Sequence, residues 1–300
     1  MSIHKSFVLT SAFPSSKTGF EALKSAVESI EPYDFSMVEY YCGNCRADQI
    51  RSLLGKYKSV FLAAALQKEQ GLNLCTPIAD DRKKAINLLS ECFRFARQAG
   101  AQSVLINSGK RPENEVQDKE CLKYLKDSIC KLHQQVNDIQ ILLEPGDRNV
   151  EYHHLIGHTD MAVSFIDDIC TDVPNISLVF DMSHIAQLNE DLYASWEMAK
   201  KHCTHVHLAN CVLDRNSSLY GDKHPLFGVK GSVYSHDTAR VFYEHLQSEN
   251  RPIAVGIEMI CHESSEQRFF ERFASETGWF FRNCEFHRPD QSSFIYIDET

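Results

Sequence analysis

Residues 177–184 read SLVFDMSH, a short apolar run that ends in Asp181 and is followed three positions later by His184. A run of this kind predicts a buried β-strand with Asp181 at its carboxyl end. Seven other segments have the same character. They are residues 7–10, 35–40, 60–63, 103–107, 139–144, 205–208 and 253–258. The chain therefore contains eight candidate strands.

Amphipathic segments separate these strands. Apolar side chains recur at three- and four-residue steps in residues 80–99, and Gly100 follows as the expected helix end. Further helices are predicted at 119–136, at 160–169 behind a cap from Thr159, and at 237–246. Alternating strands and helices favour a (β/α)₈ TIM barrel. The alternative is a doubly wound open sheet, which the missing Gly-x-Gly-x-x-Gly after the first strand disfavours.

Length and composition indicate one globular domain over residues 1–300, with residues 286–300 as a C-terminal tail. The chain is 43% hydrophobic and 24% charged, and its formal net charge is −10. Such a negative chain would repel nucleic acid. Neither a signal peptide nor a membrane span is recognisable, so we expect a cytoplasmic protein. We expect the apolar run Phe294–Ile297 to pack either beneath the barrel or against a second copy in a homo-oligomer, and the sequence does not distinguish these arrangements.

The eleven cysteines show no repeating spacing in a chain too large to depend on disulfides, so reduced thiols are expected. Cys42 and Cys45 form the one close pair. A zinc half-site or a redox dithiol would use this spacing, but no partner Cys-x-x-Cys or His-x-x-x-His follows. We interpret both as loop cysteines. The clustered His153, His154 and His158 are likewise expected to be surface or capping groups.

Four residues at the carboxyl ends of the last four strands carry the predicted chemistry. They are Glu144, Asp181, His207 and Glu258. In a barrel these ends point into one mouth, where three carboxylates stay ionised only if a cation neutralises them. The donor set of three oxygens and one imidazole nitrogen favours Mn²⁺, Mg²⁺ or Co²⁺, with Zn²⁺ as the alternative. The sequence therefore predicts a single divalent metal ion.

These motifs resemble the xylose isomerase-like barrels, a family of sugar isomerases, ketose 3-epimerases, inosose dehydratases and type IV AP endonucleases. Leu143-Glu144-Pro145, Asp181-Met182-Ser183-His184, His205-Val206-His207-Leu208 and Gly256-Ile257-Glu258 carry the resemblance. It implies that Glu144, Asp181, His207 and Glu258 are the metal ligands. It also implies that His184 contacts the substrate as a catalytic group and that Glu258 is an acid/base.

Two loop features extend the resemblance. Arg215, after the seventh strand, is similar to an arginine that several epimerases present to the substrate. The stretch 222–231, with Asp222 and His224, resembles an Asp-x-His motif that holds zinc in the endonuclease branch. The third and fourth strands offer no histidines for a trinuclear site. We therefore expect His224, with His184 and Arg215, to bind the substrate.

The expected function is that of a metal-dependent isomerase or epimerase in carbohydrate metabolism. Its small polyhydroxylated substrate would lose a proton next to a carbonyl to Glu144 or Glu258 and pass through an enediolate. A dehydratase of inosose or dehydroshikimate type would use the same groups. A phosphodiester endonuclease and a non-catalytic scaffold barrel are the remaining alternatives.

Overall fold

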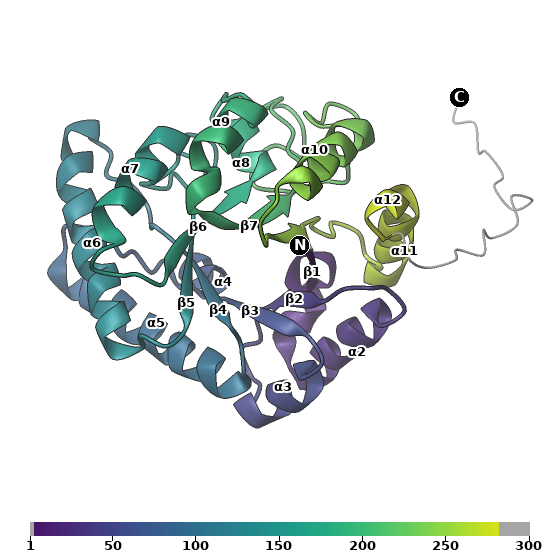
Figure 1. The fold of residues 1–300 in the computed structure, drawn as a ribbon, viewed down its shortest axis with the longest axis horizontal. Coiled ribbons are helices and arrows are strands. Elements are labelled where there is room, and N and C mark those ends of the chain that lie inside the picture. The colour runs from purple at the N-terminus through teal and green to yellow at the C-terminus, as the bar shows by residue number, and fades with distance from the viewer. Residues whose placement is uncertain (1–2, 282–300) are drawn as a thin grey trace, which may run out of the picture.

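The computed structural model describes residues 3–281, and its eight parallel strands close into a barrel (Figure 1). The strands are β1 (His4–Val8), β2 (Met37–Tyr40), β3 (Lys58–Leu62), β4 (Ser103–Asn107), β5 (Gln140–Glu144), β6 (Ile176–Asp181), β7 (Cys203–Leu208) and β8 (Ala254–Ile257). Each strand pairs with its neighbour in sequence, and β1 also pairs with β8. The predicted TIM barrel is confirmed, and the doubly wound alternative is excluded.

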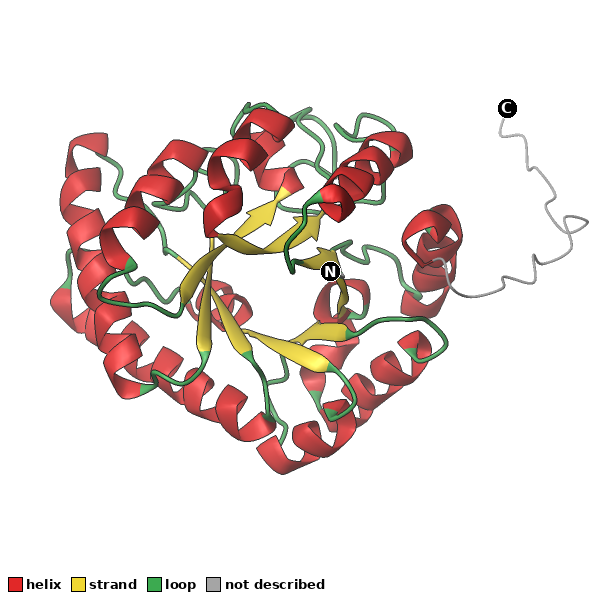
Figure 2. Ribbon diagram, viewed as in Figure 1, coloured by secondary structure: helices red, strands yellow, loops and turns green. Residues whose placement is uncertain are grey.

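Helices surround the strands, and most of them form an outer ring (Figure 2). They are α1 (Leu9–Ala12), α2 (Phe20–Ile30), α3 (Ala47–Leu54), α4 (Ala63–Gln70), α5 (Ala79–Ala99), α6 (Asp118–Gln135), α7 (Thr159–Ile169), α8 (Met182–Gln187), α9 (Leu192–Ala199), α10 (His236–Ser248), α11 (Glu266–Glu276) and α12 (Gly278–Phe281). Because helices cover the outer face and side chains fill the interior, the strands are buried on both faces. Every residue of β4 and β6, for example, is buried.

The predicted elements match those observed, although several ends shift by one to three residues. All eight strands and the four predicted helices form, and Gly100 ends α5 with a φ of 86°. The first strand, however, ends at Val8, because Leu9 already begins α1. The cap assigned to Thr159 is wrong: Thr159 is the first helical residue of α7, and its hydroxyl donates to Glu190 instead.

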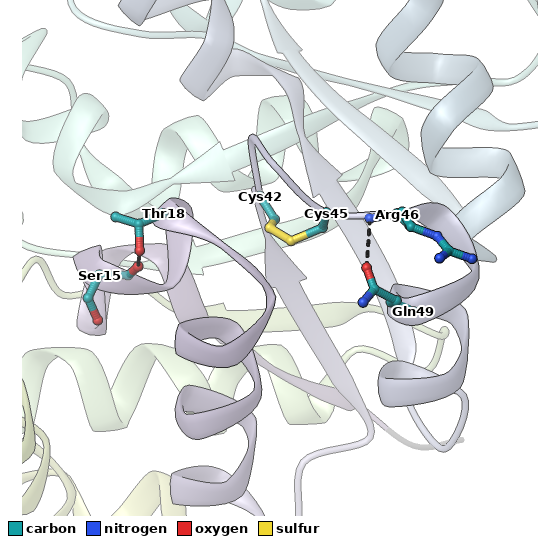
Figure 3. Close-up of a disulfide and its surroundings, with 6 residues drawn as sticks. All are labelled: Ser15, Thr18, Cys42, Cys45, Arg46 and Gln49. Carbon is teal, nitrogen blue, oxygen red and sulfur yellow. Dashed lines mark hydrogen bonds between the residues drawn. A yellow bond between two sulfur atoms is a disulfide. The ribbon is translucent and has the colours of Figure 1, made fainter.

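The turn after β2 contains a disulfide between Cys42 and Cys45 (Figure 3). The tight turn places their Cα atoms 5.9 Å apart, within the usual range for a disulfide. The expectation of reduced thiols is therefore wrong for this pair. Eight other cysteines in the described part of the chain are free. Beyond the turn, the backbone N–H of Arg46 donates to Gln49 at the start of α3 (Figure 3).

Aromatic packing joins the final helices to the first strand. Phe7, on β1, is completely buried, and its ring contacts those of Phe13, Phe35, Phe270, Phe273 and Phe281. Three of these five partners belong to α11 and α12, so the last helices cover the seam where β1 meets β8. The tail 286–300, with its Phe294–Ile297 run, lies outside the described residues. None of the helices in 3–281 is both long and apolar enough to cross a membrane.

Replacing Phe7 with alanine should destabilise the barrel strongly, because five aromatic neighbours would face a cavity. Large-to-small changes at buried phenylalanines cost about 3–5 kcal/mol. Chemical denaturation of F7A should show this loss in the free energy of unfolding. The control is Val116→Ala, at a side chain that is 83% exposed, where a change within about 0.5 kcal/mol is expected. Equal stability of the two variants would contradict the assigned packing.

Candidate metal centre

The four predicted ligands come together at the carboxyl end of the barrel. Glu144 is the last residue of β5, Asp181 is the last of β6, and Glu258 directly follows β8. His207 lies in β7, paired in register with Asp181. One candidate ligand atom from each of the four residues lies within 4.8 Å of the others. Parallel strands cause this convergence, because their carboxyl ends all meet at one rim.

The Nδ1 atom of His207 is the centre of the cluster. It lies 3.0 Å from Oε2 of Glu258, 3.1 Å from Oε1 of Glu144 and 3.6 Å from Oδ2 of Asp181. A single N–H at this atom cannot serve three carboxylates, because it carries only one proton. Three carboxylates therefore surround one nitrogen, and its single hydrogen can bond well to only one of them.

Asp181 divides its two carboxylate oxygens between the fold and the cluster. Its Oδ1 accepts from the backbone N–H groups of Ser183, at 2.7 Å, and of His184, at 3.2 Å, and so caps α8. Its Oδ2 is buried in the cluster without a hydrogen-bond partner among the described residues. A buried carboxylate oxygen without a donor is costly, and a bound cation would satisfy it.

The pKa shifts show how strongly this region attracts positive charge. Burial alone would lower the pKa of His207, but the carboxylates of Glu39 and Glu258 raise it well above its usual value. Burial alone would raise the pKa of Asp181, yet the imidazole of His184, above all, holds it well below its usual range. A divalent ion held by the four residues fits their three carboxylates and one imidazole. It also fits the unpaired Oδ2 of Asp181 and the carboxylates that raise the pKa of His207.

Glu258 is held in place by a residue of the first helix, α1. Its Oε1 accepts from the hydroxyl of Ser11 in α1, at 3.0 Å, while Oε2 faces His207. Burial would raise the pKa of Glu258, but His224 and His207 lower it. Ser11 therefore fixes one oxygen of this carboxylate and leaves the other directed at the cluster.

A second group of polar residues adjoins the first. Nδ1 of His224 lies 3.8 Å from Oε2 of Glu258, and the His184 and His224 rings are 5.7 Å apart. Asp222 accepts from Nε2 of His224 and, at 2.6 Å, from the ammonium of Lys68. Asp181, His184 and His224 also have ligand atoms within 4.8 Å of one another. This side of the cluster, however, already contains the Lys68 cation.

These charges stabilise one another. Burial raises the pKa of Asp222, but Lys68 and His224 together bring it well below its usual value. Burial lowers the pKa of His224, whereas Asp222 and Glu258 raise it to about 10. The ammonium of Lys68 thus contacts one oxygen of Asp222, and His224 contacts the other. The structure places His184 and His224 beside the four candidate ligands, and their contact with a substrate stays a prediction.

Arg215 and His154 are also singled out in the sequence. Arg215 is exposed in the loop after β7, and within residues 3–281 its side chain has no hydrogen bond or ion pair. Its contact with a substrate stays a prediction. The surface assignment of His154 is wrong: it is 5% exposed, and burial, above all, lowers its pKa to about 3. An isolated antiparallel bridge joins its backbone to that of Lys110.

Comparison with known families identifies the family of this chain. The model of the xylose isomerase-like TIM barrel matches residues 15–271. The chain belongs to this family. The resemblance predicted from residues 139–258 is thereby confirmed, and it extends over most of the barrel.

Three similar proteins share little sequence with this chain. A protein of Synechocystis described as a "probable ketose 3-epimerase" is 24% identical over 182 residues, 56% of this chain and 58% of that protein. An L-ribulose 3-epimerase structure has a TM-score of 0.72 at 12% identity and covers 93% of this chain and 95% of its own. An AP endonuclease family 2 structure from Brucella melitensis has a TM-score of 0.64 at 17% identity, covering 91% and 99%. At these identities the structures demonstrate the shared fold.

The sequence analysis missed three contributors to the site. Glu39 lies in β2, Lys68 in α4 and Ser11 in α1. Lys68 and Ser11 carry no motif that links them to the distant residues they contact. Glu39 gave one usable signal, because it is an acidic residue within an otherwise apolar predicted strand. Such a residue requires a buried partner.

Removing a ligand should abolish metal retention while leaving the barrel folded. For Asp181→Ala and His207→Ala we expect metal affinity to fall by more than about 100-fold, beyond the loss seen for an outer hydrogen-bond partner. Elemental analysis after dialysis measures the metal content, and circular dichroism checks the fold. His184→Ala is the matched control in the neighbouring group and should keep its metal while losing most turnover. Equal metal in wild type and both ligand variants would contradict the assigned centre.

Proposed function

We propose that this protein is a divalent-metal-dependent sugar epimerase or isomerase that works by removing a proton next to a carbonyl. The observation that carries the proposal is the placement of Glu144 and Glu258 at the carboxyl ends of β5 and β8, on either side of the strands with Asp181 and His207. Two carboxylates therefore approach one point from opposite sides. The similarity to an L-ribulose 3-epimerase and a "probable ketose 3-epimerase" supports this reaction class.

A bound divalent ion would supply Lewis-acid polarisation of adjacent carbonyl and hydroxyl oxygens, which acidifies the neighbouring C–H. Glu144 or Glu258 then removes that proton, and the opposite carboxylate returns a proton on the other face or at the next carbon. His184, buried beside the cluster, donates a hydrogen bond to the negative oxygen of the enediolate. Ser11 holds Glu258 in its proton-transfer orientation.

A cavity next to the site offers space for a polyhydroxylated molecule. It measures about 400 Å³, and its walls include Lys68, Asn107, Tyr152 and His154. Lys68 connects this cavity to the cluster, since its ammonium pairs with Asp222 and lies 4.3 Å from the centre of the Tyr152 ring. Several donors and acceptors beside an aromatic face suit a sugar, which presents hydroxyls on its edges and C–H groups on its faces.

The same groups suit a dehydratase, which would expel a β-hydroxyl after forming the enolate, and this is the second candidate. An endonuclease is less well supported. The strand β3 and the residues after it read Phe61-Leu62-Ala63-Ala64-Ala65, without a histidine. Lys68 already compensates Asp222, and the net charge of −10 disfavours a nucleic acid backbone.

Proton exchange at carbon is the decisive test. Incubating the Mn²⁺-loaded protein in heavy water with a panel of ketoses, aldoses and cyclitols should give deuterium incorporation at one carbon of an accepted substrate. The product then identifies the reaction: an epimer, an isomer or a dehydrated compound. Cleavage of an abasic DNA duplex, without exchange in any sugar or cyclitol, would overturn the proposal in favour of a phosphodiesterase.

The two proton-transfer residues can be tested separately. Glu144→Gln and Glu258→Gln keep an oxygen ligand but remove the basic carboxylate, so turnover should fall by about 10²–10⁴-fold at saturating metal. In an epimerase, one variant should still exchange deuterium without inversion, because a single base forms the enediolate. Glu263→Gln, which loses only a surface pair with Arg272, is the control. Full activity in both Gln variants would rule out carboxylate acid/base chemistry.

A further inference from the structure

A fully buried carboxylate lies beneath the metal centre, on a strand that contributes none of the four ligands. Glu39 projects from β2 into the barrel interior and is 0% exposed. Its Oε1 accepts from the hydroxyl of Ser6, at 2.8 Å, and from Nε2 of His205, at 2.9 Å. Its Oε2 lies 3.0 Å from Nε2 of His207. Glu39 therefore binds the side of His207 that faces away from the ligand cluster.

The two ring nitrogens of His207 consequently have separate roles. Nδ1 faces Glu144, Asp181 and Glu258, whereas Nε2 faces Glu39. A neutral imidazole carries its hydrogen on one nitrogen and a lone pair on the other. A carboxylate at Nε2 can only accept a hydrogen, so it favours the form in which Nδ1 keeps its lone pair. That lone pair is what a metal ligand requires.

The barrel leaves room for this contact at one specific position. Gly256 of β8 is in register with both His207 and Ser6. A Cβ atom at Gly256 would lie 2.4 Å from Oε1 of Glu39 and 3.1 Å from Cδ2 of His207. Any side chain at Gly256 would therefore displace the carboxylate or the imidazole. The glycine thus permits the carboxylate of β2 to reach across the barrel to β7.

We infer that Glu39 is the positioning residue of the metal centre: it fixes the orientation and the hydrogen of His207 so that Nδ1 is available to the ion. This inference rests on the metal centre of the proposed function, but on no choice of substrate. Ser6 and His205 hold the other carboxylate oxygen, so Glu39 itself has little freedom to turn. The strand β2 thereby supports a centre whose ligands all come from the second half of the barrel.

The test is the dissociation constant for Zn²⁺ and Mn²⁺, measured by competition with a chelator. Glu39→Gln keeps the size of the side chain but replaces the acceptor carboxylate with an amide that also donates. Affinity should fall by about 10–100-fold, the usual loss when an outer partner of a ligating histidine is removed. Ser6→Ala removes a partner of Glu39 without touching His207 and should stay within about 3-fold of wild type. Glu39→Asp, which keeps a carboxylate, should lie between E39Q and wild type.

A second readout separates positioning from general stability. In Zn²⁺-loaded wild type labelled with ¹⁵N-histidine, the His207 signals should show the hydrogen on Nε2, and in E39Q this signature should be lost or mixed. A lower melting temperature of metal-free E39Q with unchanged metal affinity would overturn the inference, as would wild-type affinity in E39Q and E39D alike. If E39Q does not fold, E39D decides by the same criterion. A wild-type protein that binds no divalent ion would instead overturn the proposed metal centre itself.

Discussion

The convergence of three carboxylates on one imidazole nitrogen is the constraint on which the candidate site depends. Like charges at this distance repel, and burial strengthens the repulsion because little water screens it. The repulsion nevertheless persists in the folded chain, because the ends of strands β5, β6 and β8 all place an acidic side chain near His207. A bound cation would offset the repulsion between the three carboxylates. The orphaned Oδ2 of Asp181 agrees with that view.

Two groups of polar residues adjoin the candidate metal centre. Below it, Glu39, Ser6 and His205 form a closed hydrogen-bonded group inside the barrel. Beside it, Lys68 and His224 neutralise Asp222. In the inference drawn above, the first group orients His207, while the second provides a cation that pairs with Asp222 beside the cluster.

The family contains proteins with different named activities on one barrel, so the fold alone does not identify the reaction. The epimerase and endonuclease structures resemble this chain to a similar degree, with TM-scores of 0.72 and 0.64. Two features of particular residues separate the epimerase from the endonuclease proposal: the ammonium of Lys68 at Asp222 and the absence of histidines from residues 61–65. Both support the proposed sugar chemistry over phosphodiester cleavage.

The sequence by itself determined the barrel and indicated the four candidate metal ligands. Buried parallel strands require apolar runs, and the carboxyl end of each run is visible in the chain, so Glu144, Asp181 and Glu258 could be recognised without coordinates. Tertiary structure alone decided the partners. Glu39 and His207 are separated by 168 residues, and Lys68 and Asp222 by 154, so no local pattern could have joined them. The disulfide of Cys42 and the burial of His154 likewise follow from how particular turns fold. Strand order brings distant residues to one rim, but only side-chain packing selects which of them touch.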